Sequence, residues 1–404
     1  MKTAFTNATI LPIEGDIIEG GILIIDNGKI TDIGNSVSVD GCEIIDCSGK
    51  FIVPGFIDAH SHVSLWPEGV SAYPAGGDGN ERMEAVNSHL RTLDAIWPED
   101  IGMDDARRGG VTTMGLTHGS ANPIGAQFAV VKSYGNNVEK MLIRAPAGIK
   151  FAMGENPKRV GFEQKRLPST RMSTAYVIRD AFYQALDYRE EWEHYEKSQE
   201  IEQGKDESER KSMRKPKINL TYEALLMLID NKIPVMSHAH RADDIITAIR
   251  LSEEFGYKLV IHHATESYKV KDVIVEKGIP VVVGPLFGTR VKHELKDQKV
   301  STPGVMMKAG ALVCITTDAP VIPINGLLDT VIMAVREGLP SERALETITI
   351  NPAKVLGVDN RTGSLKVGKD ADFLIFNGDP LDARNKLEKT YIDGNLVYEL
   401  TELL

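Results

Sequence analysis

The middle of this chain repeats one pattern, in which a short apolar run rich in β-branched residues precedes a segment with helical periodicity. The apolar runs are residues 111–115, 233–237, 258–262, 279–283 and 311–315, and the helical patterns lie at 242–254, 269–277 and 327–337. Strand–helix repeats of this length are typical of a parallel α/β barrel. The sequence therefore predicts an α/β fold of the (β/α)8 TIM-barrel type, with its chemistry at the carboxyl ends of the strands.

Both ends of the chain indicate β structure instead. The turn Asp26-Asn27-Gly28 lies between two apolar runs, and Asp393-Gly394-Asn395 has the same setting near the C-terminus. Such turns favour tight hairpins, but the few strands at either end are too small to fold alone. We therefore predict a small β-sandwich domain built from residues 1–52 and 358–404, with the barrel, residues 53–357, inserted between its halves.

Composition limits the partners and the setting of the protein. The formal net charge of -11 argues against nucleic acid or an anionic membrane as the main partner. No apolar run approaches the ~18 residues of a membrane span, and three scattered cysteines cannot form a disulfide framework. We expect a cytoplasmic protein that acts on a small molecule. The apolar faces of a two-domain barrel make a homo-oligomer plausible.

One segment carries two histidines in a notable spacing. A short apolar run at 50–53 leads into Pro54-Gly-Phe-Ile-Asp-Ala-His60-Ser-His62. Alternate side chains of an extended chain point to the same side, so His60, His62 and Asp58 share a face. Two imidazoles on one face can hold a divalent ion, although an isolated His-x-His is more often an ordinary surface or capping pair.

Side chains of metal-ligand type also follow three other predicted strands. These are His238 and His240 after 233–237, His262 and His263 at the end of 258–262, and Asp318 after 311–317. Six of the ten histidines thus lie at three strand ends. Packing explains one buried histidine at such a place, but it does not explain the same coincidence at every strand end. The set predicts a metal site, most simply for zinc.

This set resembles the amidohydrolase superfamily. The resemblance rests on the segment from Pro54 to His62, on the strand-end residues His238, His263 and Asp318, and on the C-terminal segment 351–376 that returns into a β-sandwich. It covers nearly the whole chain, and the nearest branch is that of the imidazolonepropionase- and prolidase-like proteins. It implies a metal-dependent hydrolase, with one or two zinc-like ions per chain.

The resemblance also implies a role for individual residues. It makes metal ligands of His60, His62, His238, His263 and Asp318, it leaves His240 as a substrate contact, and it places His262 where many relatives carry glutamate. For the fourth strand, two candidates remain open. Lys150 matches the lysine that CO2 carboxylates in two-metal relatives, and Glu155 could bridge two ions as an ordinary carboxylate. If neither is a ligand, the site holds one ion.

The implied reaction is hydrolysis of a carbon–nitrogen bond, most simply an amide or a cyclic amide. A divalent ion with an open position activates water near neutral pH, and Asp318 is the natural proton shuttle. Other residues near strand ends are candidates for binding the substrate: His118, Gln127, Arg159, Arg241 and Arg290. Trp66 and Tyr73 are candidates for the mouth of the site. A plain surface or loop role fits each of these equally well.

Two alternatives differ from this interpretation. A deaminase uses similar ligands on the same fold, but it generally needs a glutamate soon after the strand-five histidine, and residues 238–244 contain none. A metal-free scaffold usually lacks one of the ligands, and this chain has all of them. Composition does not choose among a dipeptidase, an N-acyl amino acid hydrolase and a ring-amide hydrolase.

Overall fold

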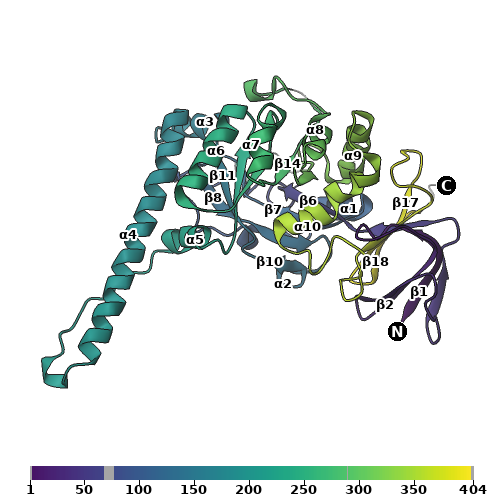
Figure 1. The fold of residues 1–404 in the computed structure, drawn as a ribbon, viewed down its shortest axis with the longest axis horizontal. Coiled ribbons are helices and arrows are strands. Elements are labelled where there is room, and N and C mark those ends of the chain that lie inside the picture. The colour runs from purple at the N-terminus through teal and green to yellow at the C-terminus, as the bar shows by residue number, and fades with distance from the viewer. Residues whose placement is uncertain (1, 68–76, 289, 402–404) are drawn as a thin grey trace.

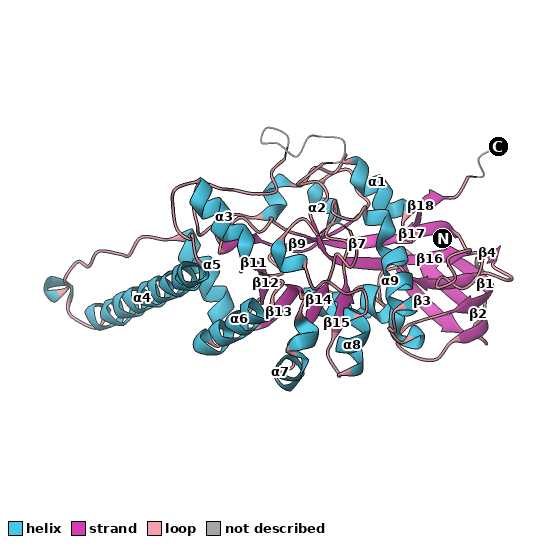
Figure 2. Cartoon of the chain, turned by 90° about the horizontal axis from the view of Figure 1, so that it is seen from above, coloured by secondary structure: helices cyan, strands magenta, loops and turns pink. Residues whose placement is uncertain are grey.

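The computed structural model describes residues 2–67, 77–288 and 290–401 (Figure 1). The described strands form three sheets. One sheet lies at the end of the molecule that carries both chain termini, and the other two lie in the body among the helices (Figure 2). The mixed α/β character predicted from the strand–helix repeats is confirmed.

Strands from both terminal segments share one sheet. Its order is β18-β17-β16-β5-β1-β2-β3, and β4 pairs with β1. The strands are β1 (Thr3–Ile10), β2 (Ile18–Asp26), β3 (Lys29–Gly34), β4 (Glu43–Asp46), β5 (Phe51–Pro54), β16 (Phe373–Phe376), β17 (Leu387–Ile392) and β18 (Asn395–Glu399). Both predicted hairpin turns are present, with positive φ at Asn27 and Asp393. Hydrogen bonds join these described strands into a single eight-stranded sheet, and its arrangement as a β-sandwich stays a prediction.

Two further sheets form the centre of the body. One has the order β10-β9-β7-β6 and the other has the order β15-β14-β13-β12-β11-β8. The strands are β6 (Phe56–Ser61), β7 (Val111–Leu116), β8 (Ile124–Gln127), β9 (Ala129–Lys132), β10 (Leu142–Arg144), β11 (Ile149–Ala152), β12 (Val235–Ala239), β13 (Leu259–His263), β14 (Val281–Val283) and β15 (Val313–Ile315). The strands from β11 to β15 are parallel, as are β6 and β7. Their carboxyl ends therefore lie on a common edge.

The histidine pair has a strand of its own. The sequence placed it beyond the run at 50–53, but that run is β5 of the terminal sheet, and His60 lies in β6. Gly55 separates the two strands. A Cβ atom there would lie 2.2 Å from the hydroxyl oxygen of Thr112, so a side chain would push β6 away from its neighbour β7.

Helices cover the central sheets (Figure 1). They are α1 (Ile101–Arg108), α2 (Val138–Met141), α3 (Glu155–Glu163), α4 (Arg171–Gln203), α5 (Leu220–Ile229), α6 (Ala242–Phe255), α7 (Lys271–Glu276), α8 (Thr302–Lys308), α9 (Leu327–Arg336) and α10 (Ile350–Leu356). The charged segment at 187–217 forms the outer part of α4 and its return. Across the described residues, no helix combines the length and apolar character that a membrane crossing requires.

A buried lysine joins the body to the terminal sheet. Lys132, at the end of β9, is 2% exposed. Its ammonium lies 2.8 Å from Asp370 and 3.1 Å from Asp372, and it also donates to Asp393. Burial tends to raise the pKa of Asp370, but Lys132 and its other cationic neighbours hold that pKa at about 2. This network ties residues 370–393 to the strand on which Lys132 lies.

Candidate metal centre

Three side chains from two strand ends meet at the carboxyl edge of the central sheets. His60 lies near the end of β6, His62 follows it, and Asp318 follows β15. The Oδ1 atom of Asp318 lies 3.3 Å from Nε2 of His60 and 3.3 Å from Nε2 of His62. Both histidines are buried, and the side chain of Asp318 is 14% exposed. Two imidazole nitrogens and a carboxylate oxygen this close suit one divalent ion.

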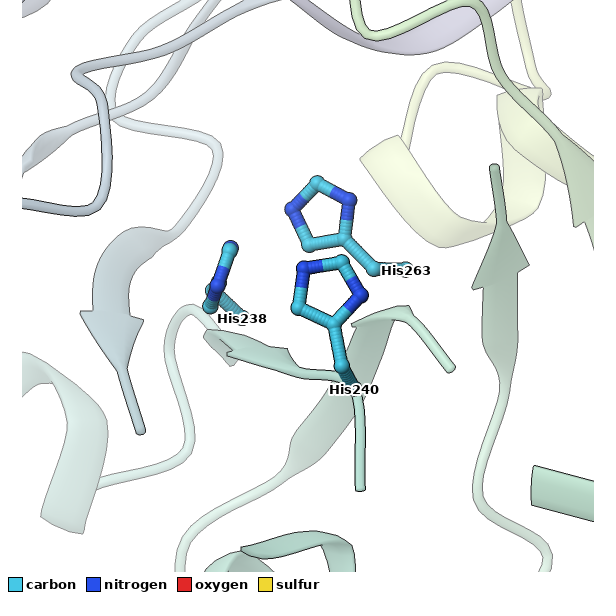
Figure 3. Close-up of side chains that lie close together, drawn as sticks. All are labelled: His238, His240 and His263. Carbon is cyan, nitrogen blue, oxygen red and sulfur yellow. The ribbon is translucent and has the colours of Figure 1, made fainter. Parts of the chain in front are cut away.

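His263 joins this group to a second one. It ends β13, and its ring lies 4.3 Å from that of His238 and 4.7 Å from that of His240, between ring centres (Figure 3). The potential ligand atoms of His238, His240 and His263 all lie within 4.8 Å of one another. The same is true of His60, His263 and Asp318. The chain thus presents two overlapping ligand groups that share His263.

Backbone geometry aims two of these side chains. His263 and Asp318 have φ values of 68° and 55°, in the left-handed region that residues other than glycine seldom adopt. Such strained positions concentrate where the surrounding structure must hold a side chain in one orientation. At His238 and His240 no strain is needed: His238 lies on β12 and His240 directly follows that strand, and residues two apart on extended chain share a face.

Hydrogen bonds and burial set the protonation of the histidines. Nδ1 of His62 donates to the carbonyl oxygen of Thr117 at 2.7 Å, and Nδ1 of His263 donates to that of Gly284 at 2.9 Å. Each bond leaves Nε2 unprotonated when the ring is neutral. Burial lowers the pKa of His263 to about 3 and that of His60 well below its usual value. The rings of His263 and His60 are therefore neutral at physiological pH, which is the form that binds metal.

His238 tests whether a metal fits these residues. Both of its ring nitrogens are buried, and neither has a hydrogen-bond partner in the described part of the chain. Burying an unpaired polar atom costs about 1–3 kcal/mol, so an imidazole in this state indicates a missing partner. The nitrogen lone pair points among other neutral imidazoles, where a cation would be well placed. The donor set and the unpaired ring both fit a divalent ion.

Of the two fourth-strand candidates, only Lys150 lies among the ligands. It is 1% exposed on β11, and its Nζ lies 3.1 Å from Nε2 of His60. Burial lowers the pKa of Lys150 to about 7. Glu155 instead begins α3, where its backbone N–H donates to Glu294. No hydrogen bond or ion pair joins the Glu155 carboxylate to the described histidines.

Asp58 holds the backbone on which two of the candidate ligands lie. It is fully buried, and its carboxylate accepts hydrogen bonds from the backbone N–H groups of His60 and Thr317 and from the hydroxyls of Thr316 and Thr317. It thereby joins the β6 strand to the turn that carries Asp318. His262, at the position where many relatives carry glutamate, lies with Nδ1 2.7 Å from Nδ1 of His60 and so orients that ring.

Asp58→Ala should lower the free energy of unfolding by about 3–5 kcal/mol, because it leaves three buried donors without an acceptor, whereas the Thr316 hydroxyl keeps the His60 carbonyl. Urea denaturation measures the loss. Thr317→Val is the matched control: it removes one of the donors and should cost about 1–2 kcal/mol. Equal unfolding midpoints for Asp58→Ala and the unmodified protein would contradict the role given to Asp58.

The predicted substrate contacts are mostly not gathered at the centre. His118 is buried, but its two ring nitrogens are occupied by Gly119 and Glu81. Gln127, the last residue of β8, pairs with Ile149, the first residue of β11. It therefore lies at the amino end of β11, whereas the ligands lie at the carboxyl ends of the strands. The three arginines behave as surface residues: Arg241 pairs with Asp243, Arg159 lies near Glu163, and Arg290 is exposed. Only His240 lies among the ligands.

Sequence reasoning missed a charged pair beside His240. Nζ of Lys292 lies 3.4 Å from Nε2 of His240 and 3.2 Å from Oε1 of Glu294. Glu294 is 1% exposed, and its other oxygen accepts from the Glu155 N–H. Gly154, at φ 80°, makes this approach possible, since a Cβ atom there would lie 2.6 Å from Oε2 of Glu294.

The mouth of the site contains further groups. Trp66 packs edge-on to His62, with ring centres 4.5 Å apart. Tyr73 lies outside the described residues. Lys292 and Glu155 line a cavity of about 390 Å³ beside the centre, together with Arg159. The side of the centre nearest His240 therefore offers a cation, Lys292, where the sequence had suggested arginines.

Comparisons with known proteins point to one family. An amidohydrolase from Thermotoga maritima MSB8 has a solved structure with a TM-score of 0.90 and 43% identity, covering 98% of this chain and 100% of that one. The 5-methylthioadenosine/S-adenosylhomocysteine deaminase of Bacillus cereus is 25% identical over 98% of this chain and 90% of its own length. Amidohydrolase TasK of Hapsidospora irregularis is 26% identical over 94% of this chain, which spans only 40% of that protein. The amidohydrolase family model matches residues 51–397, and the chain belongs to the amidohydrolase family.

Proposed function

We propose that this protein is a metal-dependent hydrolase that cleaves a carbon–nitrogen bond of a small molecule. The observation that carries the proposal is the pair of overlapping ligand groups around His263, with the carboxylate of Asp318 facing three of the neutral imidazoles. Membership of the amidohydrolase family supports the reaction class. A bound divalent ion, most simply zinc, would polarise the scissile carbonyl and make water acidic enough to attack near pH 7.

The chain's own residues then have distinct tasks. His60, His62, His238 and His263 hold the ion or ions through ring nitrogens. Asp318 accepts the proton of the attacking water on a carboxylate oxygen and returns it to the leaving nitrogen. Its partial exposure gives that oxygen access to a substrate. Lys292 supplies a cation for an anionic group of the substrate, and His240 adds a ring nitrogen beside it.

We also propose that the two central sheets are parts of one closed (β/α)8 barrel, residues 53–357, with residues 1–52 and 358–404 as the second domain. Hydrogen bonds bridge the sheets on both sides. The His62 N–H donates to the Ala319 carbonyl at 2.9 Å, and the Phe128 N–H donates to the Gly148 carbonyl at 2.8 Å. These contacts support closure around the ligand edge.

Lys150, rather than Glu155, is our candidate for bridging two ions. An ammonium group 3.1 Å from a ligand nitrogen would repel a cation, whereas a lysine carboxylated by CO2 would offer two anionic oxygens. Lys150→Met should therefore reduce metal content from two ions per chain to one, while the matched variant Glu155→Gln should retain both. A loss in Glu155→Gln instead would move the bridge to Glu155.

The central experiment combines metal analysis of the purified protein with a substrate screen. Dipeptides, N-acyl amino acids and lactam-like rings test for hydrolase activity. Methylthioadenosine tests for deaminase activity, because one relative with 25% identity is a 5-methylthioadenosine/S-adenosylhomocysteine deaminase. Release of ammonia without ring or amide cleavage would favour the deaminase. Chelation should abolish turnover and zinc should restore it. A protein that takes up no divalent ion under any condition would contradict the proposal.

A further inference from the structure

Helix α4 has one face that its own chain leaves largely uncovered, although Tyr183 packs edge-on against Phe255 of α6 with ring centres 5.4 Å apart. α5 and α6 pack against its first half, where the buried residues from Thr174 to Tyr188 lie on one side. On the opposite side four large apolar side chains are exposed: Met172 (80%), Tyr176 (54%), Tyr183 (55%) and Ile201 (64%). At 3.6 residues per turn these four lie within roughly 40° of arc. We call them the α4 stripe. It extends about 44 Å along the helix.

The outer half of α4 makes few packing contacts with the rest of the described chain. It projects from the body, and no residue of the helix beyond Tyr188 is buried (Figures 1 and 2). The return segment contacts it on the side away from the stripe, where Lys215 lies 5.4 Å from the ring centre of Trp192. Helices of this length are marginal in water, and most helices in proteins are stabilised by packing. A second covering element would supply that packing.

The polar residues of the same face make the stripe complementary to itself. Glu190, His194 and Lys197 are exposed between Tyr183 and Ile201. If two copies of α4 lie antiparallel with a twofold axis between Leu186 and Asp187, three facing pairs result. Met172 meets Ile201, Tyr176 meets Lys197, and Tyr183 meets Glu190. These are an apolar contact, a cation–π contact and a hydroxyl–carboxylate hydrogen bond, and the symmetry repeats each of them.

We propose that the protein forms a homodimer in which α4 of one copy packs antiparallel along α4 of the other. The outer half of each helix then covers the stripe on the inner half of its partner. A second copy is favoured over an unrelated partner because the two residues of each pair lie at equal distances on either side of the same midpoint. An unrelated partner would impose no such symmetry on this face. The proposal does not depend on the reaction that the protein catalyses.

Disulfide trapping tests both the dimer and its register. The background variant is Cys42→Ser, which removes the one cysteine that is not buried. A cysteine introduced by Asp187→Cys would lie about 1.5 Å along the helix axis from the same cysteine of the second copy. With helix axes 8–10 Å apart, the two Cα atoms come within disulfide range. Mild oxidation should link most of the protein into dimers. The matched variant Lys197→Cys is on the same face, but it lies about 31 Å along the axis from its mate and should stay unlinked.

Light scattering and sedimentation complete the test. The unmodified protein should have twice the mass of one chain, and Ile201→Glu or Tyr176→Glu should raise the dimer dissociation constant at least tenfold. Both residues are exposed, so circular dichroism should show an intact fold in these variants. A monomer at all concentrations would overturn the proposal. So would a dimer in which Asp187→Cys fails to link, or in which Lys197→Cys links equally well.

Discussion

Asp318→Asn should reduce turnover about 10²–10⁴-fold, the usual contribution of a positioned acid–base group, while leaving metal in the protein. The amide keeps an oxygen that can face His60 and His62, but it cannot accept the proton of the attacking water. Turnover is measured on the best compound of the substrate screen, and metal content is measured on the same preparation. The two measurements separate loss of proton transfer from loss of the ion.

Asp297→Asn is the matched control for this experiment. Asp297 is partly exposed and pairs with Lys269 at 2.7 Å, away from the ligand histidines, so its variant should keep full turnover. If Asp318→Asn remained as active as Asp297→Asn, the proton shuttle would have to be another group. If it lost both activity and metal, Asp318 would be needed first as a ligand, and its role in proton transfer would need a separate test.

Lys132→Met should lower the free energy of unfolding by about 3–5 kcal/mol. It would remove the ammonium that lies against Asp370, Asp372 and Asp393 together, leaving the buried carboxylate of Asp372 without its ion pair and that of Asp370 with Lys29 and Arg361. Lys29→Met is the control. Lys29 also pairs with Asp370, at 2.5 Å, but its side chain is 49% exposed, so its loss should cost at most about 1 kcal/mol. Thermal and urea unfolding measure both, and equal losses would contradict the role of burial.

Lowering the pH should reduce the difference in free energy of unfolding between the unmodified protein and Lys132→Met. Because the pKa of Asp370 is held at about 2, below its usual value of 3.8, its carboxylate stabilises the folded state above about pH 4. That contribution is lost as the pH falls from about 4 towards 2. In Lys132→Met the strongest of the cationic influences that lower this pKa is gone, while Lys29 and Arg361 remain beside Asp370, so the pKa of Asp370 should rise towards its usual value and its protonation should cost less. The stability gap between the two proteins should therefore shrink over this pH range.

The structure brings the predicted ligand residues together because simple geometry governs their positions, and their role as ligands stays a prediction. His60 and His62, like His238 and His240, are two residues apart on extended chain, and parallel strands bring their ends to one edge. The pair Lys292 and Glu294 follows no such rule. It lies on a loop nine residues or more beyond β14, and it reaches the centre only because Gly154 lacks a side chain. The arginines were misplaced for the same reason, since loop direction is set by tertiary contacts.

The fold was predictable to a similar depth. Hairpin turns and strand–helix repeats can be recognised locally, so the terminal β structure and the α/β body were both anticipated. The separation of β5 from β6 was not. An apolar run that continues into a histidine pair looks like one strand, and only the contact of Gly55 with Thr112 shows where one sheet stops and the other begins.

The pairing of β5 with β16 affects the order in which this protein can form as it is synthesised. Phe51 lies opposite Phe376, so β5 lacks one of its two neighbours until the ribosome has added all the residues between them. At about 5–20 residues per second this takes roughly 15–65 s. β6 and its histidines follow β5 after one glycine. The histidine pair is therefore synthesised early, but the strand that leads into it gains its last neighbour only after β16 has been synthesised. A nascent chain would therefore become able to hold metal only when its C-terminal strands emerge.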